Sequence, residues 1–235
     1  MEETKNKEII DAMFKVGAHF GYSKSRRHAS MAPYIFGAKN RTEIINLEKT
    51  AELLEEVTNF ISKLASEGKQ ILFVGGKNES RNAIRNAAMS VEMPFVSGRW
   101  VGGTFSNFVE IKKRINKFED LVDQREKGQL SKYTKKERLL IDRQIDNLEK
   151  LFSGLVLMKD MPKAMFVVDP RREKIAVAEA QSVGIPVIAL SGTDCDISKI
   201  DFPVVANDSS VSSINFFVSE ISKAYKKAKV AKKAI

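Results

Sequence analysis

The chain has 235 residues, of which 43% are hydrophobic, and a net charge of +9. This length allows one large domain or one domain with an insertion, and this hydrophobic content is sufficient for a sizeable core. A single cysteine excludes an intrachain disulfide, and no apolar run approaches the length of a membrane span, so we expect a cytoplasmic protein without a signal peptide or membrane contact.

The positive charge is concentrated at the C-terminus. Residues 221–235 hold six lysines and no acid, which leaves +3 for the other 220 residues. A basic chain favours a polyanionic partner. Because the body is only mildly basic, a polyanion site on it must be formed by local groups of basic residues.

The first 46 residues combine a short helix with a basic loop. Charged and apolar residues alternate over 6–16, which predicts an amphipathic helix that ends at Gly17. The next segment is glycine-rich and basic, and segments 34–36 and 43–46 are expected to pair as a short hairpin. The candidate phosphate-binding residues here are Lys24, Arg26, Arg27 and, in the hairpin turn, Arg41.

Residues 47–105 are expected to form a strand–helix–strand unit preceded by a long helix. Asn46 is a predicted N-cap for a helix over 47–66, and Gly68 ends it. The strands are predicted at 71–74 and 94–97, with a helix over 78–90 between them. The turn at Gly75–Gly76 matches neither phosphate-loop motif of nucleotide-binding proteins, so turn geometry is the preferred explanation of these glycines.

Residues 106–150 are strongly charged, with 12 basic and 9 acidic residues. Apolar residues spaced by three and four form two short seams, which predicts an antiparallel coiled-coil hairpin inserted at 106–152. Thr134 and Glu137 form a predicted capping box for the second helix. The seams are Phe108, Ile111, Ile115, Phe118 and Val122, then Ile141, Ile145, Leu148 and Phe152. Lys112 and Arg114 are candidate phosphate-binding residues on the first helix.

Residues 164–190 form the clearest strand–helix–strand unit. Strands are predicted at 164–168 and 185–190 because both runs are continuously apolar. Asp169 and Pro170 predict a helix start, and Gly184 predicts its end. Arg171 and Arg172 then fall in the first helical turn, where cations are unfavourable. Two explanations stay open: Glu173 screens the arginines in water, or a phosphate approaches this helix end.

A fifth strand is predicted at 202–206 and a last helix after the caps at 207–210. Together these elements predict an α/β fold: a flavodoxin-like, doubly wound, five-stranded parallel sheet in the order 2-1-3-4-5. The predicted organisation is an N-terminal region at 1–46, a sheet domain at 47–105 and 153–225, the hairpin at 106–152 and a lysine-rich tail at 226–235.

Catalytic motifs are weak. Strand-end aspartates can hold Mg²⁺, but Asp169 and Asp208 have expected roles as helix caps, and no nucleophile–base pair is evident. Cys195 lies between two aspartates, which raise a thiol pKa. His19 and His28 are a weak zinc pair without cysteines, so we expect no metal and no cofactor. The alternative function is a flavodoxin-like enzyme or nucleotide-binding switch that uses the strand-end aspartates. Arg99, beside Trp100 in GRWVGGTFSNF, is a further candidate phosphate ligand.

Several stretches resemble the bacterial small-subunit ribosomal protein two family, in the order of that family and over about residues 8–220. They are GAHFGYSKSRRHASMAPYIFG, IINLEKT, ILFVGGK, GRWVGGTFSNF and VVDPRREKIAVAEAQSVGIPVIALSGTDCD. Tyr22, the run His28-Ala29-Ser30 and Gly76 depart from the usual bacterial pattern. The resemblance implies a non-enzymatic, ribosome-bound protein that binds small-subunit ribosomal RNA and neighbouring ribosomal proteins. Among these neighbours is the first small-subunit ribosomal protein, which captures messenger RNA.

Overall fold

Five parallel strands form the central sheet of the computed structural model, which describes residues 2–233 and the side chains of 7–230. The strands are β4 (Ile71–Val74), β5 (Phe95–Val96), β6 (Ala164–Val168), β7 (Val187–Ser191) and β8 (Phe202–Val205). Their order is β5-β4-β6-β7-β8, which confirms the predicted order 2-1-3-4-5.

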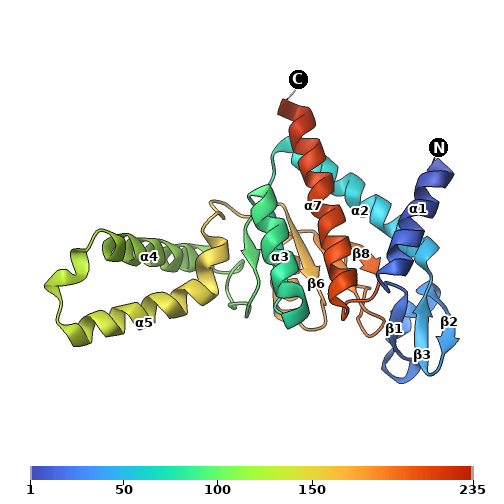
Figure 1. Ribbon diagram of the computed structural model, residues 1–235, viewed down its shortest axis with the longest axis horizontal. Coiled ribbons are helices and arrows are strands. Elements are labelled where there is room, and N and C mark those ends of the chain that lie inside the picture. The colour runs from blue at the N-terminus through green and yellow to red at the C-terminus, as the bar shows by residue number, and fades with distance from the viewer. Residues whose placement is uncertain (1, 234–235) are drawn as a thin grey trace.

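Helices cover both faces of this sheet (Figure 1). The helices α2 (Leu47–Glu67), α3 (Asn78–Val91) and α7 (Val211–Lys233) share a hydrophobic core with Ile71 and Phe73 of β4. The opposite face packs against α6 (Lys174–Val183), and there the core includes Leu72 and Val74. Successive residues of a strand point to opposite faces, so a continuously apolar strand serves two cores.

Most predicted helix ends are confirmed. The side chain of Asn46 accepts a hydrogen bond from the Glu48 amide at 2.9 Å, and Gly68 ends α2 in the left-handed conformation. Gly184 ends α6 in the same way. Before α7, the side chain of Asn207 accepts from the amides of Ser209 and Ser210. The lysine-rich tail continues from the last helix, because α7 extends as far as Lys233.

The N-terminal region adds α1 (Glu2–Lys15) and a three-stranded antiparallel sheet in the order β1-β3-β2. The predicted hairpin is confirmed as β2 (Ile35–Lys39) and β3 (Thr42–Ile45), joined by a tight turn in which Asn40 and Arg41 have positive φ. The strand β1 (Phe20–Ser23) was not predicted. It is short and contains Gly21, and its pairing with β3 is irregular. Two 3₁₀ helices lie between β1 and β2, at Lys24–Arg26 and Ala29–Tyr34.

Residues 108–152 form a helical hairpin that extends from the body (Figure 1). Its helices are α4 (Phe108–Glu126) and α5 (Lys135–Phe152), and the 3₁₀ helices Gln129–Lys132 and Ser153–Leu155 follow them. The predicted capping box of Thr134 and Glu137 is present. The base of the hairpin belongs to the body, because Ile111, Ile115 and Phe152 pack in one cluster with Trp100 and Leu155. No described helix is long and apolar enough to cross a membrane.

Candidate nucleic-acid interface

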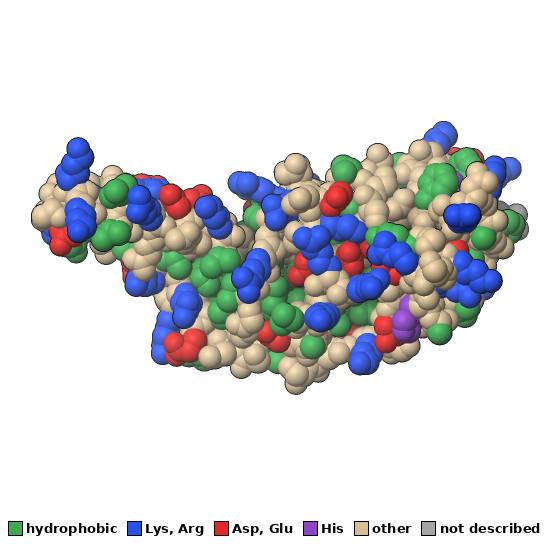
Figure 2. Space-filling view, turned by 90° about the horizontal axis from the view of Figure 1, so that it is seen from below, with side chains coloured by type: hydrophobic (Ala, Val, Ile, Leu, Met, Phe, Trp, Pro, Cys, Tyr) green, Lys and Arg blue, Asp and Glu red, His purple; other side chains and the backbone are tan. Residues whose placement is uncertain are grey.

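The turns after the parallel strands meet at one end of the sheet. They are 75–77 after β4, 169–173 after β6, 192–201 after β7 and 206–210 after β8. Parallel strands point the same way, so the turns at their carboxyl ends share one edge. Figure 2 looks onto this end, and Lys and Arg side chains gather there with acidic side chains among them. This edge is the candidate interface.

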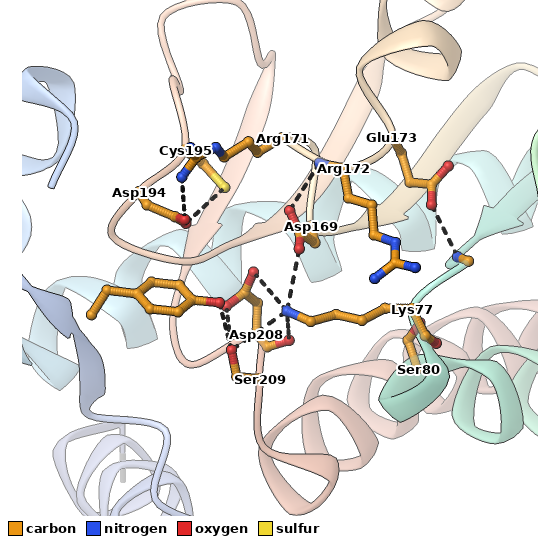
Figure 3. Close-up of polar contacts among 12 residues, drawn as sticks. Lys77, Ser80, Asp169, Arg171, Arg172, Glu173, Asp194, Cys195, Asp208 and Ser209 are labelled. Atoms are coloured by element: carbon orange, nitrogen blue, oxygen red, sulfur yellow. Dashed lines mark hydrogen bonds and ion pairs between the residues drawn. The ribbon is translucent and has the colours of Figure 1, made fainter. Parts of the chain in front are cut away.

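Lys77 is the centre of a buried polar cluster at this edge (Figure 3). Its Nζ atom lies 3.2 Å from Oδ2 of Asp169, 3.0 Å from the carbonyl oxygen of Asp208 and 3.4 Å from Oγ of Ser209. Burial lowers the pKa of Lys77, but the charges of Asp208 and Asp169 outweigh burial and raise it. Burial, with the charge of Asp169, raises the pKa of Asp208 to about 6.

Two of the strand-end aspartates, Asp169 and Asp208, are held by this ammonium. Asp169, Cys195 and Asp208 place ligand atoms within 4.8 Å of one another, the only such group of three in the part of the chain that the structure describes. Lys77 already supplies a positive charge to both carboxylates. Burial, then Asp208 and Asp169, raises the pKa of the Cys195 thiol, so the thiol stays protonated and is a poor metal ligand. The cluster is therefore a structural ion-pair network.

Neither aspartate caps a helix, contrary to the sequence prediction. Residues 170–173 form a turn, and α6 begins only at Lys174. Asp169 has a φ of 62°, and its Oδ1 atom accepts a hydrogen bond from the Arg172 amide at 3.1 Å. Because Lys77 binds the other carboxylate oxygen, a long-range ion pair fixes a conformation that the local Asp–Pro signal does not predict. Arg171 and Arg172 lie in this turn and not in the first helical turn.

Glu173 is buried and does not screen both arginines in water, as one of the open explanations required, although its carboxylate does interact electrostatically with Arg172. Its carboxylate is buried and accepts a hydrogen bond from the Gly76 amide at 3.2 Å. Burial raises the pKa of this carboxyl. A Cβ atom on Gly76 would lie 2.5 Å from the Gly98 carbonyl oxygen and 2.7 Å from Oε1 of Glu173, so this close approach explains the glycine.

Arg171 instead shares a carboxylate with Arg26 from the first basic loop. Oδ2 of Asp194 lies 2.9 Å from Nη2 of Arg26 and 2.5 Å from Nη1 of Arg171. The Asp194 side chain is only 5% exposed, whereas the arginine side chains are 54% and 58% exposed. Arg172, the next residue, is also exposed. The structure thus brings together two predicted site residues from distant segments, Arg26 and Arg171, whereas the side chain of Arg172 points away from Asp194 (Figure 3).

The other predicted site residues are distributed more widely. Arg27 pairs with the buried Glu43 at 3.1 Å, so part of its role is structural. Lys24 is exposed beside it, Arg41 is exposed at the tip of the β2–β3 hairpin, and Arg99 is exposed in the loop before α4. On α4, Arg114 is exposed, and Lys112 donates to the Lys159 carbonyl at 2.8 Å.

The loop that carries Arg99 is organised by Glu179 of α6. Oε1 of Glu179 accepts from the Gly103 amide at 2.7 Å and from Nε1 of Trp100 at 3.4 Å, and Oε2 accepts from the Phe105 amide at 3.1 Å. Trp100 is buried against Phe105. The tryptophan is therefore a core residue, and the neighbouring arginine side chain is left exposed.

The two histidines have separate surroundings. His19 stacks on Phe14, with ring centroids 4.5 Å apart. His28 interacts through Nδ1 with the Ser30 hydroxyl at 2.8 Å and lies 3.8 Å from Asp196. Neither histidine belongs to a group of three metal-ligating side chains among the described residues.

Three residues that shape the interface were not predicted: Tyr22, Lys77 and Glu179. The Tyr22 ring lies 4.2 Å from Cζ of Arg26, and its hydroxyl is 2.6 Å from Oγ of Ser209. The sequence offered one signal for Lys77, its position directly after a buried strand and a Gly–Gly turn. The signal was incomplete, because its acidic partners lie 92 or more residues away in the sequence.

Comparison with known proteins identifies the family. The model of the family Ribosomal protein S2 matches residues 13–228. The chain is 40% identical over 213 residues to the small ribosomal subunit protein uS2 of Roseiflexus sp. (strain RS-1), a match that covers 91% of this chain and 81% of that protein. It is 38% identical over 215 residues to the protein of the same name from Chloroflexus aggregans (strain MD-66 / DSM 9485), covering 92% and 90%. The fold, the basic edge of the sheet and these matches together show that the chain belongs to the ribosomal protein S2 family.

Proposed function

We propose that this protein is a structural constituent of the small ribosomal subunit and binds its ribosomal RNA through the basic edge of the sheet. Membership of the ribosomal protein S2 family supports the assignment to the small subunit and to translation. The observation that carries the RNA-binding part is the exposed group of Arg26, Arg171 and Arg172 at the carboxyl ends of the strands. Most protein–nucleic acid contacts go to phosphates and need such groups.

The remaining basic residues extend this interface in the proposal. Lys24 and Arg27 belong to the same loop as Arg26, and Arg99 follows β5. Arg41, Lys112 and Arg114 lie on the hairpins and are proposed to make peripheral phosphate contacts. Of the strand-end aspartates, which carried the enzyme alternative, Asp169 and Asp208 are engaged by Lys77, and Asp194 is engaged by Arg26 and Arg171.

The helical hairpin is proposed to be a short coiled coil that serves as an arm of the sheet domain. Ile111, Ile115 and Phe118 of α4 and Ile145 of α5 are buried, as paired seams require. The charged outer faces are then free for RNA or neighbouring ribosomal proteins. We include the first ribosomal protein of the subunit among these neighbours. The N-terminal region, the sheet domain and the hairpin are proposed as units of organisation of one fold, with the base of the hairpin packed into the sheet domain.

Sedimentation tests this function directly. The tagged protein is expected to co-migrate with small subunits in a sucrose gradient at low salt and to leave them at high salt, because phosphate contacts weaken steeply with salt. A matched variant, Arg171→Glu/Arg172→Glu, is expected to shift toward the top of the gradient. The control Lys63→Glu/Lys69→Glu, which reverses two charges on and just after α2, is expected to co-migrate normally. Wild-type protein that remains in the supernatant would contradict the proposal.

A further inference from the structure

Asp194 joins two arginines that the fold brings together from distant segments. Arg26 comes from the first basic loop and Arg171 from the turn after β6, and the same oxygen, Oδ2 of Asp194, accepts from both (Figure 3 shows the Arg171 contact). The carboxylate is nearly buried, whereas more than half of each arginine side chain remains exposed. The nearly buried carboxylate of Asp194 therefore holds two guanidinium groups in place at the surface above it.

Tyr22 holds Arg26 from a second direction. Its ring lies under the guanidinium, with Cζ 4.2 Å from the ring centroid. The ring is itself anchored, because the Tyr22 hydroxyl is 2.6 Å from Ser209 Oγ and the Tyr22 amide donates to Thr193 Oγ1 at 2.9 Å. A guanidinium that is both stacked and ion-paired loses little further freedom when it binds a ligand.

The charges leave this group positive. One carboxylate faces two guanidiniums, so the unit of Asp194, Arg26 and Arg171 carries a net charge of +1 at neutral pH. Each guanidinium has five N–H donors in a planar fork that matches the oxygens of a phosphate, and the single acceptor oxygen uses only one donor of each. More than half of each arginine side chain is exposed to solvent.

We propose that Asp194 and Tyr22 are positioning residues that preorganise Arg26 and Arg171 to bind one RNA phosphate jointly. This inference rests on the proposed function and specifies it: the ligand is a phosphate of small-subunit ribosomal RNA, and an acidic residue is part of the site. From charge alone, a carboxylate is expected to weaken RNA binding, whereas here it is proposed to support binding. This difference provides the test.

The test measures the affinity of the full-length protein for isolated small-subunit ribosomal RNA over a range of KCl concentrations. Asp194→Asn removes a negative charge, so general electrostatics predicts tighter binding. The proposal predicts the opposite, a loss of about five- to tenfold, which corresponds to the ordering of one or two released side chains on binding. The matched control is Asp196→Asn, which removes an exposed acid from the same loop without a contact to either arginine, and its affinity is expected to be unchanged or higher.

Two further variants keep the test decisive if Asp194→Asn unfolds. Arg26→Lys and Arg171→Lys preserve charge at exposed positions but lose the planar fork, and each is expected to bind about fivefold more weakly. Because both arginines bind one phosphate, the double variant Arg26→Ala/Arg171→Ala is expected to reduce the log–log salt slope by about 0.9, the value for one duplex phosphate. For the same reason, the affinity losses of the two single alanine variants are expected not to add up in the double variant.

The outcomes separate this inference from the function on which it rests. One outcome would overturn the positioning role alone. In it, the wild-type protein binds the RNA, Asp194→Asn binds it equally well or more tightly, and both lysine variants keep wild-type affinity. A second outcome would also overturn it: these variants bind isolated RNA with wild-type affinity but rebind poorly to small subunits that high salt has stripped of this protein. The arginines would then bind a carboxylate of a neighbouring protein and not a phosphate. Absence of RNA binding by the wild-type protein would overturn both the function and the inference.

Discussion

Lys77 and Asp169 form an ion pair that is almost completely withdrawn from solvent, with Nζ and Oδ2 3.2 Å apart and side chains 11% and 12% exposed. The pair joins the turn after β4 to the turn after β6. Asp208, which is 1% exposed, adds a second carboxylate 3.6 Å from the same Nζ atom. One ammonium therefore connects three strand ends beneath the basic surface, and the stability of this edge depends on its charge.

Replacement of Lys77 by methionine is expected to destabilise the protein strongly. The change leaves two buried carboxylates facing each other without a cation, and removal of one partner of a buried ion pair typically costs about 3–5 kcal/mol in the free energy of unfolding. Urea unfolding at pH 7 measures this loss. The control is Lys113→Met, which breaks an exposed pair with Glu110 and is expected to change stability by less than about 0.5 kcal/mol. Equal effects of both variants would contradict the structural role of Lys77.

The raised pKa of Asp208 predicts a distinct pH dependence of stability. In the folded state the pKa of this carboxyl is about 6, and its ordinary value is 3.8. Between these values the folded state binds the proton and the unfolded state does not, so the contribution of Asp208 to the free energy of unfolding falls as pH rises from about 4 to about 6. Relative to Asp208→Asn, the wild type is expected to lose stability across this window and to stay level above about pH 7. Asp160→Asn, at an exposed position, is expected to follow the wild-type curve in urea titrations.

Arg27 and Lys24 are expected to behave differently although they lie in one loop. Glu43 is 1% exposed and its Oε1 atom lies 3.1 Å from Nη1 of Arg27, so Arg27→Ala leaves a buried charge unpaired and is expected to cost about 2–3 kcal/mol of stability. A triple alanine variant of Lys24, Arg26 and Arg27 is therefore expected to lose stability as well as RNA affinity. Lys24→Ala is expected to change stability by less than about 0.5 kcal/mol and to lower only RNA affinity.

A double variant provides the control for Arg27. Arg27→Met/Glu43→Leu replaces both partners by apolar groups of similar size and is expected to recover much of the lost stability. Thermal unfolding and salt-dependent RNA binding, measured on the same preparations, separate the two roles. Loss of RNA affinity without loss of stability in Arg27→Ala would show that the pair with Glu43 contributes little to the fold.

The hairpin is expected to be removable only in its outer part. Replacement of residues 119–144 by a short Gly/Ser linker retains Phe118 and Ile145, so the protein is expected to keep cooperative thermal unfolding. Replacement of 107–152 also removes Ile111, Ile115 and Phe152 from the core. Each such loss typically costs about 2–5 kcal/mol, so the three together cost about as much as the whole stability of a typical domain. Native circular dichroism and cooperative unfolding of the longer deletion would instead support an independent domain at 106–152.

The sequence by itself determined the elements of the sheet and their order. The strands at 71–74 and 164–168 are continuous apolar runs. Asn46 begins α2 through local hydrogen bonds, and Gly68 and Gly184 end α2 and α6 with a left-handed backbone. These signals act within a few residues of one another, so they can be recognised without a tertiary structure. The family resemblance could be recognised for the same reason, because its motifs are contiguous, and the family match confirms it.

Only the tertiary structure decided which charges meet. Arg26 and Asp194 are 168 residues apart, and Lys77 and Asp169 are 92 residues apart. The local Asp–Pro signal placed a helix start at Asp169, but the ion pair with Lys77 accompanies a φ of 62° and a turn, and α6 begins at Lys174. Strand ends are brought together by hydrogen bonding and core packing, which have no trace in the sequence near each charge. Composition therefore indicated a basic surface, whereas the pairing of its arginines with one buried acid required the folded chain.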